Sequence, residues 1–462
     1  MVLIGLEVHA TINKLNTKLF CSCSLPRQDS PPNTHTCPIC LGHPGSKPVL
    51  NKRAFFLSLK LALALKCKIY NKLVFSRKTY FYPDLPKNYQ ITQYEQPLGN
   101  DGYITLDSGK KISIQRVHIE EDPGALVHPA GISSSNYVLI DYNRSGIPLC
   151  EIVTKPEISS PDEAREFLKK LQTIIDYLDV FDPASGVIKA DANVSIDGGE
   201  RIEVKNITGF KEIERAIVYE IKRQESLSTP PKRKETWGWD TDRGITYFQR
   251  VKEGEDDYGY IIDPDLVPID ISSELIRSSE SELPELPESL VKRWVSDLNI
   301  DSSDAKIIAN NPQLAKIFNE VSKKVDPVLA ARWIRRELSR VLNYAKKELS
   351  DTKITSTHLI ELLSFLEEKQ ITDQNAQKIL EMLVEKPFSV KQHINEHELK
   401  VISGSAMLSN LCNEAINEFP NAVKDFRDGK GEALNFLVGQ VIKKTKGQAK
   451  PDSVKEIMNS LL

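Results

Sequence analysis

Four cysteines within a twenty-residue stretch form the strongest chemical pattern in this chain. Their spacing, Cys21-x-Cys23-x13-Cys37-x2-Cys40, gives two short pairs of thiols. Such pairs can close a tetrahedron of thiolates around Zn2+, and the metal would stabilise a connecting loop that is poor in apolar residues. The alternative is four unrelated thiols. Because a site closed by four sulfurs is structural, zinc here would not take part in catalysis.

Carboxylate and imidazole side chains form a second pattern, on the polar faces of expected strands. Glu7 and His9 lie two residues apart in an alternating stretch near the N-terminus. Glu120 and Glu121 end a second stretch, and Asp191 lies on the polar side of a hairpin. Acids from several strand ends would converge to hold a hard cation such as Mg2+. For Glu7 and His9 taken alone, the alternative is an exposed strand face.

A third pattern mixes basic and aromatic residues in the segment FSRKTYFYPDLPK, residues 75–87. Arg77, Lys78 and Tyr80 are of the types that bind phosphate and stack on a base. The sequence contains no Walker A motif, dinucleotide fingerprint or Gly-rich kinase loop. The alternative is a solvated loop with a buried aromatic end.

The C-terminal stretch 431–450 is basic, and it carries Lys443, Lys444 and Lys446. Such a stretch suits the phosphates of a nucleic acid. The alternative is a solvated helix face, which is the commoner meaning of a lysine-rich helix end.

Glycine, proline and hydrophobic spacing predict the elements that position these residues. Residues 1–270 hold 17 of the 22 glycines and 19 of the 26 prolines, so we expect strands and turns there and mostly helices afterwards. Alternation predicts a strand over 4–12 and a hairpin over 188–205. The capping box Ser160-Pro161-Asp162-Glu163 predicts a helix start, and a further helix is expected over 211–224. The first part is therefore expected to be α+β, with a mainly antiparallel sheet.

Composition excludes several classes of protein. The 462 residues are 40% apolar and 27% charged, which suits a folded chain of about three domains. The formal net charge of −3 excludes a bulk polycation that coats nucleic acid. No apolar run is long enough to span a membrane and no signal peptide is recognisable, so we expect a cytoplasmic protein. Seven cysteines is an odd count, which argues against a disulfide framework.

A series of ordered motifs covers almost the whole chain. The motifs are Gly5-Leu6-Glu7-Val8-His9, Pro38-x-Cys40-Leu41-Gly42-x-Pro44-Gly45, Tyr80-Phe81-Tyr82-Pro83-Asp84-Leu85-Pro86-Lys87, Glu120-Glu121-Asp122, Asp141-Tyr142-Asn143-Arg144-x-Gly146-x-Pro148-Leu149, Glu151-Ile152-Val153, Asp191-Ala192-Asn193-Val194-Ser195, Glu203-Val204-Lys205-Asn206 and Phe436-Leu437-Val438-Gly439-Gln440. Together they resemble the B-type members of the GatB/GatE family, which belongs to the tRNA-dependent amidotransferases (GatCAB). The cysteines match the zinc-containing members of that family.

The resemblance implies three parts. These are an α+β cradle with a kinase-like site over 1–287, a helical domain over 288–402, and a small helical YqeY-like tail over 403–462. The E-type relative carries a large extra domain before its helical region. Here Asp263-Pro264-Asp265-Leu266 is followed within about twenty residues by a proline-rich boundary and helix, which favours the B type.

The resemblance also implies the activity. ATP would phosphorylate the side-chain carboxylate of Glu or Asp misacylated on tRNA, and ammonia would then displace the phosphate. Nothing in the chain resembles a glutaminase, so ammonia would come from an amidase-type A subunit that a small C subunit straps in place. Either Glu-tRNA(Gln), Asp-tRNA(Asn) or both would serve as substrate. The remaining alternatives are an E-type subunit and a non-catalytic, zinc-containing tRNA-binding scaffold.

Roles for single residues follow from the same resemblance. It assigns Glu7, His9 and Glu121 to magnesium, with Glu120 and Asp191 as catalytic acids beside them. The nucleotide phosphates are assigned to Lys78, with Arg77 and Tyr80 as further nucleotide contacts. The residues assigned to tRNA are Arg144 and Lys205 at the acceptor end, and Lys443, Lys444 and Lys446 on the backbone phosphates.

Overall fold

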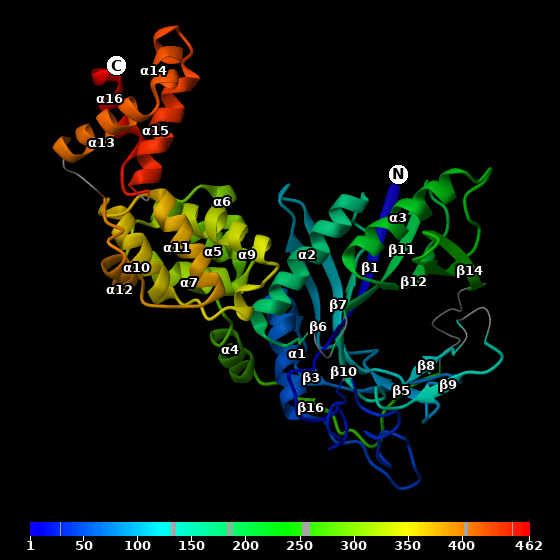
Figure 1. Ribbon diagram of the computed structural model, residues 1–462. Coiled ribbons are helices and arrows are strands. Elements are labelled where there is room, and N and C mark those ends of the chain that lie inside the picture. Colours follow the sequence, from blue (N-terminus) through cyan, green and yellow to red (C-terminus); the bar gives the residue numbers. More distant parts are fainter. Residues whose placement is uncertain are drawn as a thin grey trace. The chain divides into compact units, whose positions relative to one another are not determined.

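The computed structural model describes residues 1–27, 29–129, 131, 135–182, 186, 188–251, 259–401, 405–445 and 447–462. The chain forms two compact units, Met1–Leu286 and Pro287–Leu462 (Figure 1). Lys446 and the predicted boundary at 402/403 lie outside the described residues. Within the described residues, no helix combines the length and the apolar character that crossing a bilayer requires.

The first unit is built on a nine-stranded sheet. Neighbouring strands are antiparallel except for one parallel pair, β12 and β13, so the predicted α+β class with a mainly antiparallel sheet is confirmed. The strand order is β14 (Ile245–Val251), β13 (Glu235–Asp240), β12 (Ile202–Thr208), β11 (Ile188–Ile196), β1 (Val2–Thr11), β10 (Pro148–Thr154), β7 (Lys111–Glu121), β6 (Gly99–Thr105) and β2 (Lys68–Ile69).

One face of this sheet is apolar and is covered by helices. Alternation in β1 places Ile4, Leu6 and Val8 on this face, where all three are fully buried. They share one hydrophobic core with α1 (Lys52–Ala64), α2 (Pro161–Leu178) and α3 (Phe210–Glu225), which contribute Leu59, Phe167 and Ile217 among others. Figure 1 shows α3 beside β11 and β12, and α2 packs against α3. The opposite face is left to polar side chains.

Helix α2 begins at the predicted capping box, with one difference. The Ser160 hydroxyl accepts a hydrogen bond from the Glu163 backbone N–H at 3.2 Å, and Pro161 fills the first helical position. The Glu163 carboxylate, however, accepts from the backbone N–H of Ser159 at 2.9 Å rather than from that of Ser160. The helix ends at Asp179, whose left-handed backbone (φ 52°) stops the turn.

Smaller sheets hold the basic and aromatic segment of residues 75–87. A three-stranded sheet has the order β15 (Gly259–Ile262), β4 (Ser76–Thr79) and β5 (Tyr89–Thr92). The two-stranded sheets pair β16 (Ile269–Asp270) with β3 (Lys72–Leu73), and β8 (Ala125–Val127) with β9 (Leu139–Asp141). Helix α4 (Ser273–Ser281) follows β16 near the end of the first unit.

The described part of the second unit is helical, as predicted. Trp294 and Phe318 meet edge to face at 4.7 Å in its first half, and Leu437, Val441 and Met458 belong to a separate core near the C-terminus. A π-helical turn, Trp333–Leu338, joins two of the helices. The helices are α5 (Pro287–Leu298), α6 (Ser302–Ala309), α7 (Pro312–Val321), α8 (Pro327–Arg332), α9 (Ser339–Ala345), α10 (Ser356–Glu367), α11 (Asp373–Glu385), α12 (Val390–Glu396), α13 (Ser405–Glu418), α14 (Pro420–Arg427), α15 (Glu432–Lys444) and α16 (Pro451–Leu461).

Candidate functional site

The polar face of the nine-stranded sheet gathers ionisable side chains from five neighbouring strands. Strand pairing places Glu7 of β1 opposite Asp191 of β11, and His9 of β1 opposite Glu151 of β10. Side chains alternate along a strand. Where one residue points into the hydrophobic core, the residues before and after it point to the polar face. Two clusters result, which we call the histidine cluster and the lysine cluster.

The histidine cluster consists of His9, Glu120 and Glu151, with His118 beside them. Ligand atoms of the first three residues all lie within 4.8 Å of one another. The Nε2 atom of His9 is 3.7 Å from both carboxylates, whereas Nε2 of His118 lies 2.9 Å from Glu151 and 3.5 Å from Glu120. The cluster therefore has one close histidine–carboxylate pair and one histidine that is too distant for a hydrogen bond.

Burial and charge oppose each other in the histidine cluster. Burial by itself would lower the pKa of His118, but the carboxylates of Glu151 and Glu120 outweigh it and raise that pKa to about 9. The pKa of His9 is raised for the same reason, against its own burial. Burial would raise the pKa of Glu151, yet His118 and His9 hold it well below its usual value. The carboxylate is thus kept ionised although it is buried.

The lysine cluster consists of Glu7, Asp191, Glu203 and Lys205. Oxygens of the three acids lie within 4.8 Å of one another, and the Lys205 ammonium is 3.0 Å from Asp191 and 3.5 Å from Glu203. A bulge interrupts the pairing of β11 with β12 around Asp191. Ala190 pairs with Ile207, whereas Ala192 pairs with Val204. Burial would lower the pKa of Lys205, but these acids raise it above its usual value.

Glu121 belongs to neither cluster, because adjacent residues of a strand point to opposite faces. Its carboxylate pairs with Lys87 and accepts a hydrogen bond from the Ile91 backbone N–H at 2.9 Å. The side chains of Glu121 and Lys87 line a cavity of about 200 Å3 together with Arg77 and Cys40. The structure therefore separates Glu121 from Glu7 and His9, the residues with which it is predicted to bind magnesium.

Arg77 and Lys78, predicted to bind nucleotide, lie on β4. The Arg77 guanidinium is 3.0 Å from Asp263 and 2.9 Å from Asp265, and it stacks over the Tyr89 ring at 4.5 Å. Burial would lower the pKa of Arg77, but Asp263 keeps it raised. The ammonium of Lys78 lies 5.8 Å from the ring centre of Tyr80, which is also predicted to contact the nucleotide. Arg77 is thus held by the chain itself, at the edge of the cavity that contains Glu121.

Arg144, predicted to contact the tRNA acceptor end, is anchored to the neighbouring loop. Its guanidinium donates to the carbonyl of Pro123 at 3.0 Å and to that of Gly124 at 2.7 Å. It also lies 3.4 Å from Asp122. Burial raises the pKa of Asp122 to about 6, although Arg144 and Lys189 oppose that shift. The other predicted acceptor-end residue, Lys205, lies in the lysine cluster.

The predicted tail lysines lie at the end of α15. Lys443 and Lys444 occupy its last turn, where positive charge complements the helix dipole. The Lys444 ammonium is 2.6 Å from Glu418 and 3.5 Å from Glu414, two acids of α13. Part of this basic end is therefore compensated within the tail.

The structure brings the four predicted zinc ligands together. Two of these cysteines are buried, two are half-buried, and their sulfurs all lie within 4.8 Å of one another. The fully buried Lys18 reaches the same place, with its ammonium 3.8 Å from Cys40 and 2.7 Å from the carbonyl of His35. A hydrogen bond from Cys21 and the charge on Lys18 lower the pKa of Cys40 to about 4. Cys67 is buried elsewhere, and burial raises its pKa to about 12.

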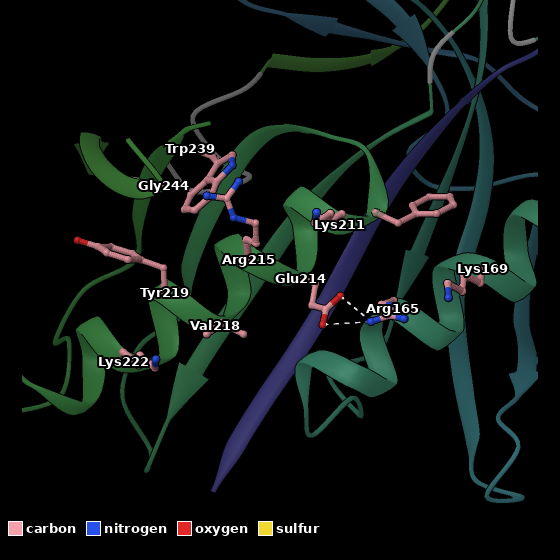
Figure 2. Close-up of a pocket in the computed structure, with 11 residues that line it drawn as sticks. Arg165, Lys169, Lys211, Glu214, Arg215, Val218, Tyr219, Lys222, Trp239 and Gly244 are labelled. Carbon is pink, nitrogen blue, oxygen red and sulfur yellow. Dashed lines mark hydrogen bonds and ion pairs between the residues drawn. The ribbon is translucent and has the colours of Figure 1, made fainter. Parts of the chain in front are cut away.

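A cavity of about 700 Å3 lies apart from these clusters, between α2 and α3 (Figure 2). Arg165 pairs with Glu214 across it at 3.2 Å, and Arg215 lies over Trp239 at 5.8 Å. None of the acids of the two clusters lines this cavity. This cavity lies among the helices that cover the apolar face, so the expected chemistry belongs to the polar face on the opposite side of the sheet.

Sequence reasoning missed Glu151, His118, Glu203 and Lys18 as site residues. Glu151 and Glu203 stand within recognised motifs. His118 begins the acidic segment that contains Glu120 and lies on the same strand face, so alternation could have given it a role beside Glu120. No local signal marks Lys18. Its role depends on segments that are distant in sequence.

Comparison with known proteins identifies the family of this chain. The model of the GatB/GatE catalytic domain matches residues 2–277, and that of the GatB domain matches residues 316–462. The B subunit of the aspartyl/glutamyl-tRNA(Asn/Gln) amidotransferase from Methanococcoides burtonii is 42% identical, over 100% of this chain and 98% of that protein. Its counterparts from Sulfolobus acidocaldarius (43%; 100% of both chains) and Thermotoga maritima (40%; 99% of this chain and 98% of that protein) are similar. The chain belongs to the GatB/GatE family, as its motifs predict.

The close contact between His118 and Glu151 leads to a prediction about stability. Replacing His118 by Leu leaves Glu151 buried without its main partner, which should lower the free energy of unfolding by about 3 kcal/mol. The double variant His118→Leu/Glu151→Leu removes both charges and should recover most of that loss. Urea unfolding in EDTA measures both values. An equal loss in the single and double variants would contradict the pairing.

Proposed function

We propose that this chain activates the side-chain carboxylate of glutamate or aspartate misacylated on tRNA, and that the activated group is then amidated by ammonia. The observation that carries the proposal is the polar face, where acids and histidines of five strands converge in a chain related over its full length to B subunits of amidotransferases. ATP would donate its γ-phosphoryl group to the carboxylate, and the acyl phosphate formed would release phosphate when ammonia attacks.

The histidine cluster is the place where the residues fit a divalent cation. Two carboxylates and an imidazole offer hard donors within 4.8 Å of one another, and the 3.7 Å separations of His9 leave space between them. A bound Mg2+ would supply charge neutralisation and orientation for phosphoryl transfer. Glu120 and His9 would hold it, while His118 positions Glu151. Glu7, on the same strand as His9, and Asp191, on the adjacent β11, would keep the neighbouring surface acidic.

Nucleotide and tRNA would approach from the loops around this face. Lys78 on β4 would meet the phosphates as a point charge, with Tyr80 near the base and Arg77 as a fixed support. The anchored Arg144 would shape the acceptor-end loop, and the basic end of α15 would meet backbone phosphates.

The cysteine quartet fits a structural zinc. All four sulfurs lie within 4.8 Å of one another, which is close enough for one tetrahedral metal ion to bind them all. Four sulfur ligands leave no open position, so this metal would stabilise the loop and not take part in the reaction.

The chain would work as one part of a larger enzyme. Its three predicted parts, 1–287, 288–402 and 403–462, are the cradle, the helical domain and the tRNA-binding tail. The match over the full length to proteins named B subunits, with no large extra domain, favours the B type over the E type. In the cytoplasm, an amidase-type A subunit would supply ammonia from glutamine, and a small C subunit would hold the two chains together.

The reconstituted complex tests the activity directly. With ATP and glutamine it should convert Glu-tRNA(Gln), Asp-tRNA(Asn) or both, and phosphate should be released only when misacylated tRNA is present. With free ammonium as the nitrogen source, His9→Ala and Glu120→Gln should each reduce amide formation on the order of 100-fold or more, since a bound metal contributes several kcal/mol. Glu214→Gln, a helix-face change, serves as the control. Full activity of both site variants would exclude this face as the reaction site.

Zinc content tests the cysteine quartet. The wild-type chain should carry about one zinc per molecule by elemental mass spectrometry, and Cys37→Ser should lose it because three sulfurs cannot close the tetrahedron. Cys412→Ser, in the tail core, should keep the metal. Wild-type protein that contains no zinc and has all four thiols free to react would contradict the proposed zinc site.

Salt dependence of binding tests the tail. Replacing Lys443, Lys444 and Lys446 together by Ala should weaken tRNA binding and flatten its dependence on salt concentration, because fewer counterions are released. The rate of phosphate release at saturating tRNA should not change. A matched change of Lys292, Lys306 and Lys316 to Ala controls for net charge. Unaltered tRNA affinity in the tail variant would remove these residues from the interface.

A further inference from the structure

The polar face carries two acidic clusters that look alike by composition. In each cluster the ligand atoms of three residues lie within 4.8 Å of one another, which is close enough for one divalent cation. Such groups are common without a metal, so spacing alone does not say whether the face holds one cation or two. The groups already bound to the acids distinguish the two clusters.

In the lysine cluster an ammonium already stands where a cation would bind. The Nζ atom of Lys205 is 3.0 Å from Asp191 Oδ2 and 3.5 Å from Glu203 Oε1. A metal ion shared by these oxygens would lie about 2.1 Å from each, which is within the volume that the ammonium takes up. The two cations would therefore exclude each other.

Uncharged hydrogen-bond donors also contact the acids of the lysine cluster. The amide of Asn193 donates to Glu7 Oε1 at 3.0 Å, and the hydroxyl of Thr236 donates to Glu203 Oε2 at 3.0 Å. Asn193 and Glu203 are almost fully buried, with 6% and 2% of their surfaces exposed. Each acid of this cluster thus has a partner from the chain itself, as expected for buried carboxylates.

The acids of the histidine cluster also have partners from the chain, since Glu120 accepts a hydrogen bond from the Thr92 hydroxyl at 3.2 Å and Glu151 pairs with His118, but the charged partners differ. His9 lies 3.7 Å from both carboxylates, beyond hydrogen-bond length, and the ion pairs described for this cluster involve histidines only. A histidine becomes a metal ligand once it gives up its proton, whereas an ammonium offers no acceptor.

We propose that Lys205 is the built-in cation of the lysine cluster, and that it limits the polar face to one divalent-cation position, at the histidine cluster. Lys205 is a positioning residue: its ammonium holds the carboxylates of Asp191 and Glu203 in place beside the metal. The inference rests on the proposed function only in requiring that the face binds a divalent cation.

Manganese binding to the zinc-loaded, full-length chain tests this inference, with the free ion followed by electron paramagnetic resonance. Wild type should bind one Mn2+ tightly. Lys205→Met keeps a stem of similar length without the charge, so a second Mn2+ should bind to the acids that it frees. Lys205→Arg should bind one. The control is Lys170→Met, which removes a lysine that lies 2.8 Å from Asp107 and 3.6 Å from Glu166 on the helix surface.

Variants of the acids test the same assignment without removing Lys205. Asp191→Asn should keep one Mn2+ per chain, whereas His9→Ala should lose it. Loss of Mn2+ binding in Asp191→Asn would overturn the proposal even if Lys205→Met does not fold. A single Mn2+ in a folded Lys205→Met protein would overturn it while leaving the proposed function intact. No Mn2+ in wild type would contradict both.

Discussion

The strict alternation of side chains along the central strands is the constraint on which this structure depends. Fully buried Ile4, Leu6 and Val8 hold one face of β1 against the helices, and this fixes Glu7 and His9 on the other. A shift of pairing by one residue would drive these polar side chains into the apolar core and expose the core residues. The hydrophobic side of the sheet therefore sets the geometry of the chemical side.

Compensation of charge is the second condition for such a face. Carboxylates removed from water are costly unless a base or a hydrogen-bond donor accompanies them. Here His118 accompanies Glu151, and Lys205 accompanies Asp191 and Glu203. The protein can thus hold a dense acidic surface in place before any ligand arrives, which is the arrangement that makes electrostatic catalysis effective.

Much of this arrangement follows from local sequence, and the limits are equally physical. Alternation predicted the strand over 4–12, the hairpin over 188–205 and the polar side of Glu7, His9 and Asp191. The same rule could have separated Glu121 from Glu120, because neighbours on a strand face opposite ways. The pairing of β10 with β1, which brings Glu151 to His9, links segments more than a hundred residues apart along the chain, and the pairing of β10 with β7 brings the same Glu151 to His118. Local sequence patterns predict neither this strand pairing nor the bulge that brings Lys205 to Asp191.

The buried ammonium of Lys18 has a consequence for how the first unit folds. It donates to the carbonyl of His35 at 2.7 Å and to that of Tyr142 at 3.4 Å, and it faces Cys40. One charge thus connects the cysteine loop to Tyr142, which lies 124 positions after Lys18 in the chain. Contacts of such sequence separation form late, after their loop entropy has been overcome. The cysteine loop is therefore no autonomous finger, and it should reach its final form only when the sheet around it has closed.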